Sequence, residues 1–391
     1  MTIPVMRPWI GEAEAQAAAK AIASGWVAQG PRVAEFEAAF AAAIGTGHAV
    51  AVSSCTAALH LTLVVRGIGP GDEVVVPSLS FIATANAVRY VGACPVFADV
   101  DEATQNLTPQ TVAPHLTGRT RAVILVDQAG VPADLDAMLG LCGPRGIEVI
   151  EDAACAAGSL YRGRPVGGTA ALAAFSFHPR KLLTTGEGGM VVTHDGDVAA
   201  RLRRLREHGM NVSAAERHAS AQPVIERYLE TGFNYRMTDI QAAIGLVQLG
   251  KLERLVARRR LLAARYTEML ADIGGLVAIG DPRHASDPPG ACYGTTNYQA
   301  FWVLLPPDFP VSRDELLRLL ADAGVSARRG VMAAHLEPAY EQQAHAPLPV
   351  TERLTADSLI LPLFHELTDE QQEQVVSVIK VAAGRRPAVR A

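Results

Sequence analysis

Seven short apolar runs in the first half of the chain constrain its fold more than any other feature. Several are rich in Val and Ile without alternating polar residues, which is typical of strands covered on both faces. Most of the intervening segments are long enough for a helical crossover. The pattern predicts an α/β fold with a mostly parallel seven-stranded sheet and helices on both faces. The predicted strands are His48–Val52, Glu73–Pro77, Pro95–Ala98, Arg121–Val126, Ile147–Ile150, Leu172–Phe177 and Gly189–Thr193.

The last two predicted strands are connected differently from the others. About eleven residues separate Phe177 from Gly189, and they leave little room for a crossover helix. We therefore expect Gly189–Thr193 to run antiparallel to the strand before it. Ahead of the first strand, the alanine-rich Glu12–Ser24 and the amphipathic Val33–Ile44 are predicted helices.

The length of 391 residues favours two domains over one. A helical periodicity begins at Asp239 and continues away from the predicted strands. Beyond it, an apolar run at Tyr298–Leu305 and a helical pattern at Arg313–Ala323 suit a smaller unit. We therefore predict a large cofactor-binding α/β domain at residues 1–250 and a small C-terminal α+β domain at residues 251–391.

Several polar segments lie outside these predicted cores. The basic run Arg258–Arg260 is predicted to be the solvated face of a helix rather than a binding patch. Asn211–Gly232 and Asp281–Asn297 are rich in polar and helix-breaking residues and are predicted to be long loops. The tail Gly384–Ala391 is predicted to be frayed.

Charge and cysteine content exclude several classes of protein. With 35 Lys and Arg against 40 Asp and Glu, the chain has a formal charge of -5 and lacks the basic excess of a nucleic-acid-binding protein. Its five cysteines are scattered and form neither C-x-x-C nor a zinc-ligand spacing. These features indicate a reduced, cytoplasmic protein without a metal site, and no secretory signal pattern is visible.

One uncharged stretch of 28 residues, Ala38–Val65, is longer than the roughly 20 residues of a membrane helix. Gly45–Gly47 and Ser53–Ser54 divide it into three pieces, and its Ala and Thr residues dilute its hydrophobicity. We therefore expect a helix, a strand and a helix, all buried in the core, and no membrane partner.

Residues at the carboxyl ends of the parallel strands are the candidates for chemistry, because ligands bind at that edge of an open sheet. Ser53–Thr56 connects a strand to a helix, where it could bind a phosphate or merely cap the helix. Asp152 ends an apolar run, where a carboxylate either meets a cationic partner or caps a helix. Lys181 follows the next run, where it is either a nucleophilic amine or an ordinary solvated lysine.

Taken together, these residues indicate a class of ligand more specifically than any one of them does. Neither a Walker loop nor G-x-G-x-x-G is present, which argues against nucleoside triphosphates and dinucleotides as ligands. A phosphate-binding turn, a carboxylate able to protonate a pyridine nitrogen, an aromatic ring at Phe81 and a nucleophilic lysine together predict a site for pyridoxal 5′-phosphate (PLP).

Six ordered sequence blocks resemble the DegT/DnrJ/StrS family of PLP-dependent sugar aminotransferases. The resemblance is close from Gly25 to about Tyr266 and looser beyond, through SARRGVMAAHLEPAY and SLILPLF. It implies a fold-type-I homodimer whose two active sites lie at the subunit interface. The six blocks are AVAVSSCTAALHL, GDEVVVPSLSFIATANAV, PVFADVD, VIEDAACAAG, FSFHPRKLLTTGEGGMVVT and GFNYRMTDIQAA.

The resemblance also implies roles for individual residues. Lys181 would attach the cofactor covalently, Asp152 would pair with its pyridine nitrogen, and Phe81 would stack on its ring. The remaining cofactor-binding candidates are the Cys55 backbone, Thr56 and Ser176 at the phosphate, Asn234 at the phosphate of the partner subunit, and Cys155 near the ring hydroxyl. The candidates for substrate contact are Arg236, His335, Asp127 and His178, and for Arg236 and His335 the alternatives are a surface salt bridge and a structural histidine.

Three positions depart from the commonest family pattern. Cys55 stands where Gly is usual, and a backbone contact tolerates this change. Cys155 replaces Gln or His, and Asp127 replaces His, so both change the hydrogen bonding near the ring hydroxyl or the substrate. These departures bear on substrate identity rather than on cofactor binding.

The function that this resemblance implies is a ping-pong aminotransferase. L-glutamate or L-glutamine would donate the amino group, and the keto group of a nucleotide-linked sugar or deoxysugar would accept it. Family members that dehydrate sugars carry His at the lysine position, and Lys181 argues against that chemistry. Two alternatives stay open: amination of a ketocyclitol in an aminoglycoside-type pathway, and a non-catalytic, regulatory PLP-binding protein.

Overall fold

The computed structural model describes residues 2–212, 222–279 and 294–385. Its centre is a seven-stranded sheet in the order β1-β9-β8-β5-β4-β2-β3. All seven strands were predicted from the apolar runs, each within two residues of its observed ends. Their bounds are β1 His48–Val52, β2 Glu73–Pro77, β3 Cys94–Ala98, β4 Thr120–Val126, β5 Glu148–Asp152, β8 Leu172–Ser176 and β9 Gly189–Thr193.

The antiparallel direction of β9 is confirmed. β9 pairs antiparallel with β8 and, on its other side, antiparallel with β1. β1 is therefore parallel to β8, and the remaining pairs, β8–β5, β5–β4, β4–β2 and β2–β3, are parallel. As a consequence, the carboxyl ends of six strands meet at one edge of the sheet.

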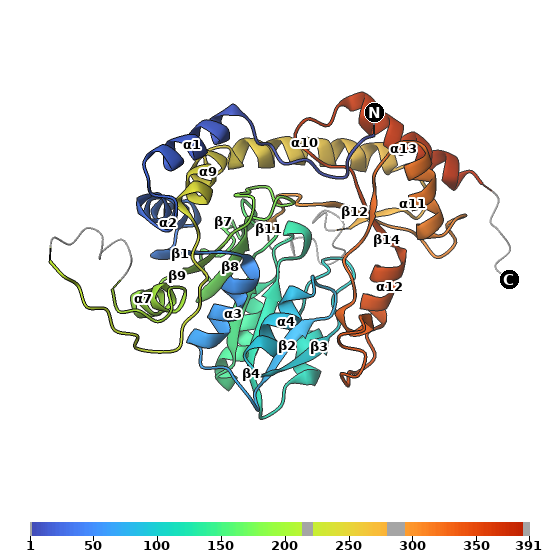
Figure 1. Cartoon of the computed structure of the whole chain (residues 1–391). Coiled ribbons are helices and arrows are strands. Elements are labelled where there is room, and N and C mark those ends of the chain that lie inside the picture. The colour runs from blue at the N-terminus through green and yellow to red at the C-terminus, as the bar shows by residue number, and fades with distance from the viewer. Residues whose placement is uncertain (1, 213–221, 280–293, 386–391) are drawn as a thin grey trace.

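Helices cover both faces of this sheet, as the uninterrupted apolar runs predicted (Figure 1). In β1, Ala49 and Ala51 belong to one hydrophobic core, whereas Val50 and Val52 belong to the other. The uncharged stretch Ala38–Val65 therefore forms part of a helix, a strand and a helix within these cores. No helix among the described residues is long and apolar enough to cross a membrane. The covering helices include α2 Pro31–Ile44 and α6 Leu135–Cys142 on the first side and α3 Cys55–Val65, α4 Ala83–Tyr90 and α7 Gly196–Leu205 on the second.

Helix α2 begins two residues before its predicted start because it is capped from far away in the chain. Pro31 occupies its first turn, and Gly30 at its N-cap has no side chain to accept a hydrogen bond. The buried carboxylate of Asp239 accepts hydrogen bonds from the backbone N–H groups of Gly30, Arg32 and Val33 at 2.8–3.0 Å. Asp239 starts α9 (Asp239–Leu249), which packs on α2 and on α1 (Glu12–Ala23). A negative charge at a helix N-terminus stabilises this junction.

The remaining elements follow the long helix α10 (Leu252–Leu270), which runs from α9 to the C-terminal elements (Figure 1). A third hydrophobic core lies beneath it, and Ile3 belongs to that core through a bridge to Val325. The domain boundary near residue 250 stays a prediction. A four-stranded sheet has the order β10 Val277–Ile279, β12 Phe301–Leu304, β14 Ser358–Leu361 and β13 Arg328–Arg329, flanked by α11 Arg313–Asp322, α12 Pro349–Asp357 and α13 Asp369–Ala383.

Smaller elements complete the described chain. A three-stranded sheet joins β11 Gly294–Thr295, β6 Leu160–Tyr161 and β7 Arg164–Pro165. The short helices are α5 Pro109–Val112 and the 3₁₀ turns η1 Ala113–His115, η2 Gln128–Gly130, η3 Gly143–Arg145 and η5 Ala334–Leu336. Much of the predicted loops Asn211–Gly232 and Asp281–Asn297, and residues 386–391 of the predicted frayed tail, lie outside the described residues.

The prediction that Arg258–Arg260 is a solvated face is wrong. Arg259 is only 2% exposed, and its guanidinium donates hydrogen bonds to the carbonyl oxygens of Tyr298 and Gln299. Its two neighbours in the run likewise donate to backbone carbonyls, Arg258 to those of His365 and Leu367 and Arg260 to that of Thr296. The run was misjudged because its partners are main-chain oxygens, which leave no pattern in the sequence.

We predict that Gly189→Ala destabilises the edge of the sheet at which the strands end. A Cβ at residue 189 would lie 2.6–2.7 Å from backbone atoms of Ser54 and Cys55, and a backbone cannot move aside as a flexible side chain can. We expect the free energy of unfolding, measured in urea, to fall by about 1–3 kcal/mol. Gly140→Ala in α6 is the control because no atom lies within 4 Å of its added Cβ. Equal stability of the two variants would contradict the prediction.

Candidate active site at the edge of the sheet

The turn between β1 and α3 presents a helix N-terminus at the sheet edge. Ser54 is the N-cap, and its hydroxyl accepts a hydrogen bond from the backbone N–H of Ala57 at 3.1 Å. The helix-capping alternative is therefore correct for Ser54. The first-turn N–H groups of a helix have no intrahelical partners, and the helix dipole favours an anion beside them. Cys55 and Thr56, the first two residues of α3, are thus placed to bind phosphate.

Asp152 ends β5 with a carboxylate that is 4% exposed. Its Oδ2 accepts a hydrogen bond from Thr84 Oγ1 at 3.0 Å, and its Oδ1 accepts one from the backbone N–H of Ala154 at 3.2 Å. Burial raises the pKa of Asp152, while these two hydrogen bonds and the Lys181 ammonium partly oppose that increase. Thr84 was not among the predicted site residues, because a threonine in the first turn of a helix carries no signal of its own.

Lys181 and Cys155 meet in the same place. Lys181 Nζ donates a hydrogen bond to Cys155 Sγ at 3.1 Å. Burial pulls the pKa of Lys181 down, but Cys155, Cys55 and Asp152 together raise it above its ordinary value. Lys181 is therefore hydrogen-bonded and only partly exposed, and its role as a nucleophilic amine stays a prediction. The Cys55 thiol lies within electrostatic reach of the same groups, and burial raises its pKa well above the usual range.

Asp127 is buried next to Asp152. It follows β4, is fully buried, and its Oδ1 accepts a hydrogen bond from the backbone N–H of Ala133 at 2.8 Å. Its own backbone N–H donates to the carbonyl oxygen of Asp152 at 3.1 Å. Burial and the neighbouring Glu151 raise the pKa of Asp127 well above its usual range, which favours a neutral carboxyl. Its Oδ2 has no hydrogen-bond partner among the described residues, and contact of Asp127 with a substrate stays a prediction.

His335 is buried and hydrogen-bonded within the chain. Its Nδ1 lies 2.6 Å from Ser78 Oγ, and its backbone N–H donates to the same oxygen at 3.1 Å. Its Nε2 faces Glu352 at 3.5 Å, and burial lowers the pKa of the imidazole. The structural alternative is therefore favoured over substrate contact.

The other predicted residues lie at or near the surface. Phe81 is 63% exposed after β2, Asn234 is exposed, and Arg236 is partly exposed beside it. His178 is partly exposed, and its backbone N–H points to Ser176 Oγ at 3.4 Å at the end of β8. These positions are open to a ligand or to a second subunit, and the roles assigned to them stay predictions.

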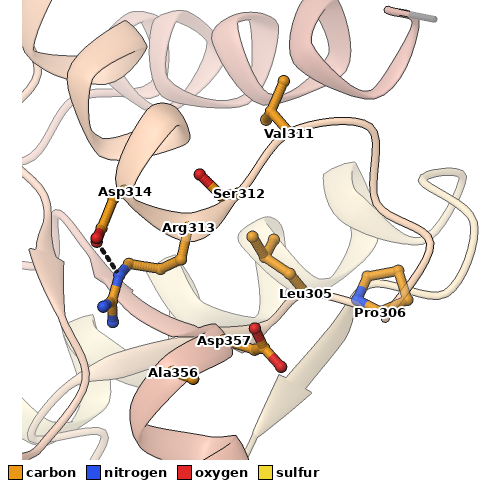
Figure 2. Close-up of a pocket in the computed structure, with 8 residues that line it drawn as sticks. All are labelled: Leu305, Pro306, Val311, Ser312, Arg313, Asp314, Ala356 and Asp357. Carbon is orange, nitrogen blue, oxygen red and sulfur yellow. Dashed lines mark hydrogen bonds and ion pairs between the residues drawn. The ribbon is translucent and has the colours of Figure 1, made fainter. Parts of the chain in front are cut away.

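A separate pocket of about 220 Å³ lies among the C-terminal elements and shares no residue with this edge (Figure 2). The Arg313 guanidinium in its wall is already bonded to Asp314 and to the carbonyl oxygens of Thr355 and Ser358. Its lining residues are Leu305, Pro306, Val311, Ser312, Arg313, Asp314, Ala356 and Asp357. It offers neither a nucleophilic amine nor an unpaired guanidinium, so the candidate site is the sheet edge.

The groups gathered at the edge match the three functional parts of PLP. The Lys181 amine suits the aldehyde, the buried Asp152 carboxylate suits the pyridinium nitrogen, and the N-terminus of α3 suits the phosphate. Asp152 is buried with a threonine and a backbone amide as hydrogen-bond donors, so an additional cation would stabilise its charge. The residues present therefore fit the cofactor.

Comparisons with known proteins show the family to which the chain belongs. A profile of the DegT/DnrJ/EryC1/StrS aminotransferase family matches residues 8–380. The aminotransferase TlmJ from Streptoalloteichus hindustanus is 38% identical, with a TM-score of 0.87 over 97% of this chain and 98% of that chain. DesI, solved in the presence of its TDP-sugar product, is 34% identical, with a TM-score of 0.87 over 98% and 93%. Spr1654 from Streptococcus pneumoniae, described as a sugar aminotransferase and solved in its PLP form, is 26% identical, with a TM-score of 0.88 over 98% and 99%.

We predict that Cys155→Ala shifts the reaction of Lys181 with aldehydes to lower pH. Cys155 raises the pKa of Lys181, so its loss leaves burial to lower that pKa and frees more neutral amine at a given pH. The rate at which apoprotein attaches PLP should therefore reach its midpoint at a lower pH, as followed by absorbance. Cys94→Ala is the control because Cys94 Sγ contacts Pro95 and Gln343 instead. A midpoint that stays in place or moves upward would contradict the prediction.

Proposed function

Because the chain belongs to the DegT/DnrJ/EryC1/StrS aminotransferase family, we propose that it moves an amino group from L-glutamate or L-glutamine to a nucleotide-linked ketosugar. The protein is a PLP-dependent sugar aminotransferase with the α/β fold of that family. The donor, the nucleotide-linked acceptor and the ping-pong order of the two half-reactions are the proposed parts. The observation that carries the proposal is the Lys181 amine held beside the buried Asp152 at the sheet edge.

PLP, when bound, supplies an electron sink for the carbon that loses or gains a proton. The chain supplies the rest of the chemistry. In the proposed mechanism, Lys181 Nζ holds the cofactor between turnovers and, once released, takes the Cα proton of the amino donor. Asp152 keeps the pyridine nitrogen protonated, and Thr84 orients its carboxylate through the 3.0 Å hydrogen bond. The N–H groups at the start of α3 and the hydroxyls of Thr56 and Ser176 hold the phosphate.

The same residues then act in reverse on the acceptor. Lys181 delivers its proton to the former ketone carbon of the sugar, and the amine product leaves. The family relative DesI was solved with a TDP-sugar product, which supports a nucleotide-linked acceptor here. The partly exposed His178 and Arg236 are the proposed contacts to that acceptor.

We further propose a cytoplasmic homodimer. Asn234 and Phe81 are exposed, although the family resemblance assigns both to a cofactor site. A second subunit against this face would cover them and let Asn234 reach the phosphate of the partner subunit. Exposed aromatic side chains near a site are often buried in an interface.

We predict that Lys181→Ala loses transamination. Purified wild-type protein with PLP should change its absorption spectrum on addition of L-glutamate alone and should then aminate a TDP-ketosugar. Lys181→Ala should slow turnover by about 10²–10⁴-fold or more, as expected for loss of a positioned acid–base group. Lys380→Ala, an exposed lysine on α13, is the matched control and should keep full activity.

The same assay separates the alternatives. Amination of ketocyclitols but not of ketosugar nucleotides would move the acceptor to the cyclitol class. A protein that binds PLP but shows no spectral response to L-glutamate, L-glutamine or any other amino donor would be regulatory. Undiminished turnover by the Lys181→Ala variant would overturn the proposed mechanism.

We predict that Asp152→Asn keeps the fold but slows turnover. The amide is isosteric, so the hydrogen bond from Thr84 can persist, whereas the charge that holds the pyridine nitrogen protonated is lost. If the lost charge pair raises the activation barrier by about 3–5 kcal/mol, the usual worth of a buried pair, turnover should fall roughly 10²–10⁴-fold. Steady-state kinetics together with the thermal unfolding midpoint test this, and unchanged turnover would exclude the proposed role of Asp152.

A further inference from the structure

A short segment from the C-terminal half, Thr296–Gln299, lies between the two loops that carry Cys155 and Lys181. We call it the 296–299 strap. Asn297 in the strap is fully buried, and its Nδ2 donates hydrogen bonds to the carbonyl oxygens of Cys155 and Ala157, each at 2.8 Å. Its backbone N–H donates to Ser159 Oγ at 3.0 Å. One side chain thus fixes the turn that follows β5.

Gln299 grips the other loop on both sides of Lys181. Its Nε2 donates a hydrogen bond to the carbonyl oxygen of Arg180, and its Oε1 accepts one from the backbone N–H of Leu182 at 3.2 Å. A glutamine amide that both donates and accepts holds a peptide in one orientation. The backbone on either side of Lys181 is therefore bonded to the same side chain.

Asn297 and Gln299 are also hydrogen-bonded to each other within the strap. The backbone N–H of Gln299 donates a hydrogen bond to Asn297 Oδ1 at 2.8 Å. This oxygen lies where a side chain at residue 130 would be, because a Cβ on Gly130 would come within 1.9 Å of it. Gly130 also has a φ of +88°, which favours glycine. The close packing of Gly130 leaves Asn297 little freedom to move.

Two residues of the basic run Arg258–Arg260 in α10 donate hydrogen bonds to the strap. Arg259 Nη1 donates hydrogen bonds to the carbonyl oxygens of Tyr298 and Gln299 at 2.9 and 3.0 Å. Arg260 Nε donates to that of Thr296 at 2.9 Å. Burial lowers the pKa of Arg259 to about 10, so the carbonyl dipoles are what stabilise its charge. Burial of a charged guanidinium is energetically unfavourable, and its hydrogen bonds to the strap offset that unfavourable free energy.

We propose that Asn297 and Gln299 are positioning residues that set the contact between Lys181 and Cys155. Asn297 places the Cys155 loop, Gln299 places the Lys181 loop, and their mutual hydrogen bond fixes the distance between the two loops. The proposal rests on the proposed function, in which Lys181 attaches the cofactor. It makes α10 and the 296–299 strap part of the structure that positions the Lys181 amine.

The test measures covalent attachment of PLP to apoprotein. The dependence of the observed rate on PLP concentration separates the limiting rate of attachment from the half-saturating concentration. Gln299→Ala should lower the limiting rate about 10- to 100-fold, the range expected for a misplaced reacting group, and leave the half-saturating concentration unchanged. The thermal midpoint of the apoprotein should fall by less than about 4 °C. Borohydride reduction and peptide mass spectrometry identify Lys181 as the attached residue.

Two matched variants keep the test sharp. Gln374→Ala removes an exposed glutamine whose Nε2 also donates to a backbone carbonyl, that of Ala323 at 2.8 Å, far from the site. It should attach PLP at the wild-type rate. Gln299→Glu keeps an acceptor for the Leu182 N–H but loses the donor to Arg180, so its limiting rate should lie between those of wild type and Gln299→Ala.

Hydrogen exchange gives a readout that needs no cofactor. In apoprotein, Gln299→Ala and Gln299→Glu should speed amide exchange at Leu182 and in the peptide around it, while exchange in α13 stays unchanged. Wild-type attachment kinetics together with unchanged exchange at Leu182 in both variants would overturn the proposal. Failure of the proposed function would be recognised by a different result. In that case PLP would attach to a residue other than Lys181 in the wild-type protein.

Discussion

Two neighbouring strands, β4 and β5, lead into acidic side chains that are buried next to each other, and the energetic cost of that burial organises the site. Burial raises the pKa of Glu151 to about 7 and raises those of Asp127 and Asp152. The cluster is stable only if some members are neutral and the charged one has partners. Asp152 has the partners, namely Thr84, a backbone N–H and the nearby Lys181 ammonium. The carboxylate with the most partners is thus the one within electrostatic reach of the lysine.

The two cysteines at the site contribute in different ways. At position 55 the useful group is the backbone at the start of α3, and the thiol is held neutral by burial. At position 155 the side chain is the partner of the Lys181 amine, so its identity acts directly on the basicity of that amine. A substitution at Cys155 should therefore change the pKa of Lys181 more directly than one at Cys55.

Features that depend on interactions between residues close in the sequence were predicted, whereas features that depend on residues far apart in the sequence were not. Strand positions and the reversal of the last strand were predicted, because apolar runs and loop lengths are local signals. Asp152 and Lys181 were named as candidates because they follow apolar runs, whereas Thr84 was missed because it follows none. The Asp239 cap on α2 and the grip of Gln299 on the Lys181 loop join residues more than a hundred positions apart, with no periodicity to reveal them. Arg259 was misjudged for a related reason: its partners are carbonyl groups, which every residue has.

The position of β9 between β1 and β8 also determines when this protein can assemble during synthesis. β1 lies at the edge of the sheet, and its neighbour there is β9, which ends at Thr193. During synthesis β1 therefore cannot pair until β9 has emerged from the ribosome. This delay is on the order of ten seconds at ordinary translation rates. Until then the turn after β1 lacks the strand against which it packs at Gly189. A nascent chain shorter than about 200 residues would thus expose an apolar strand to chaperones or to another chain.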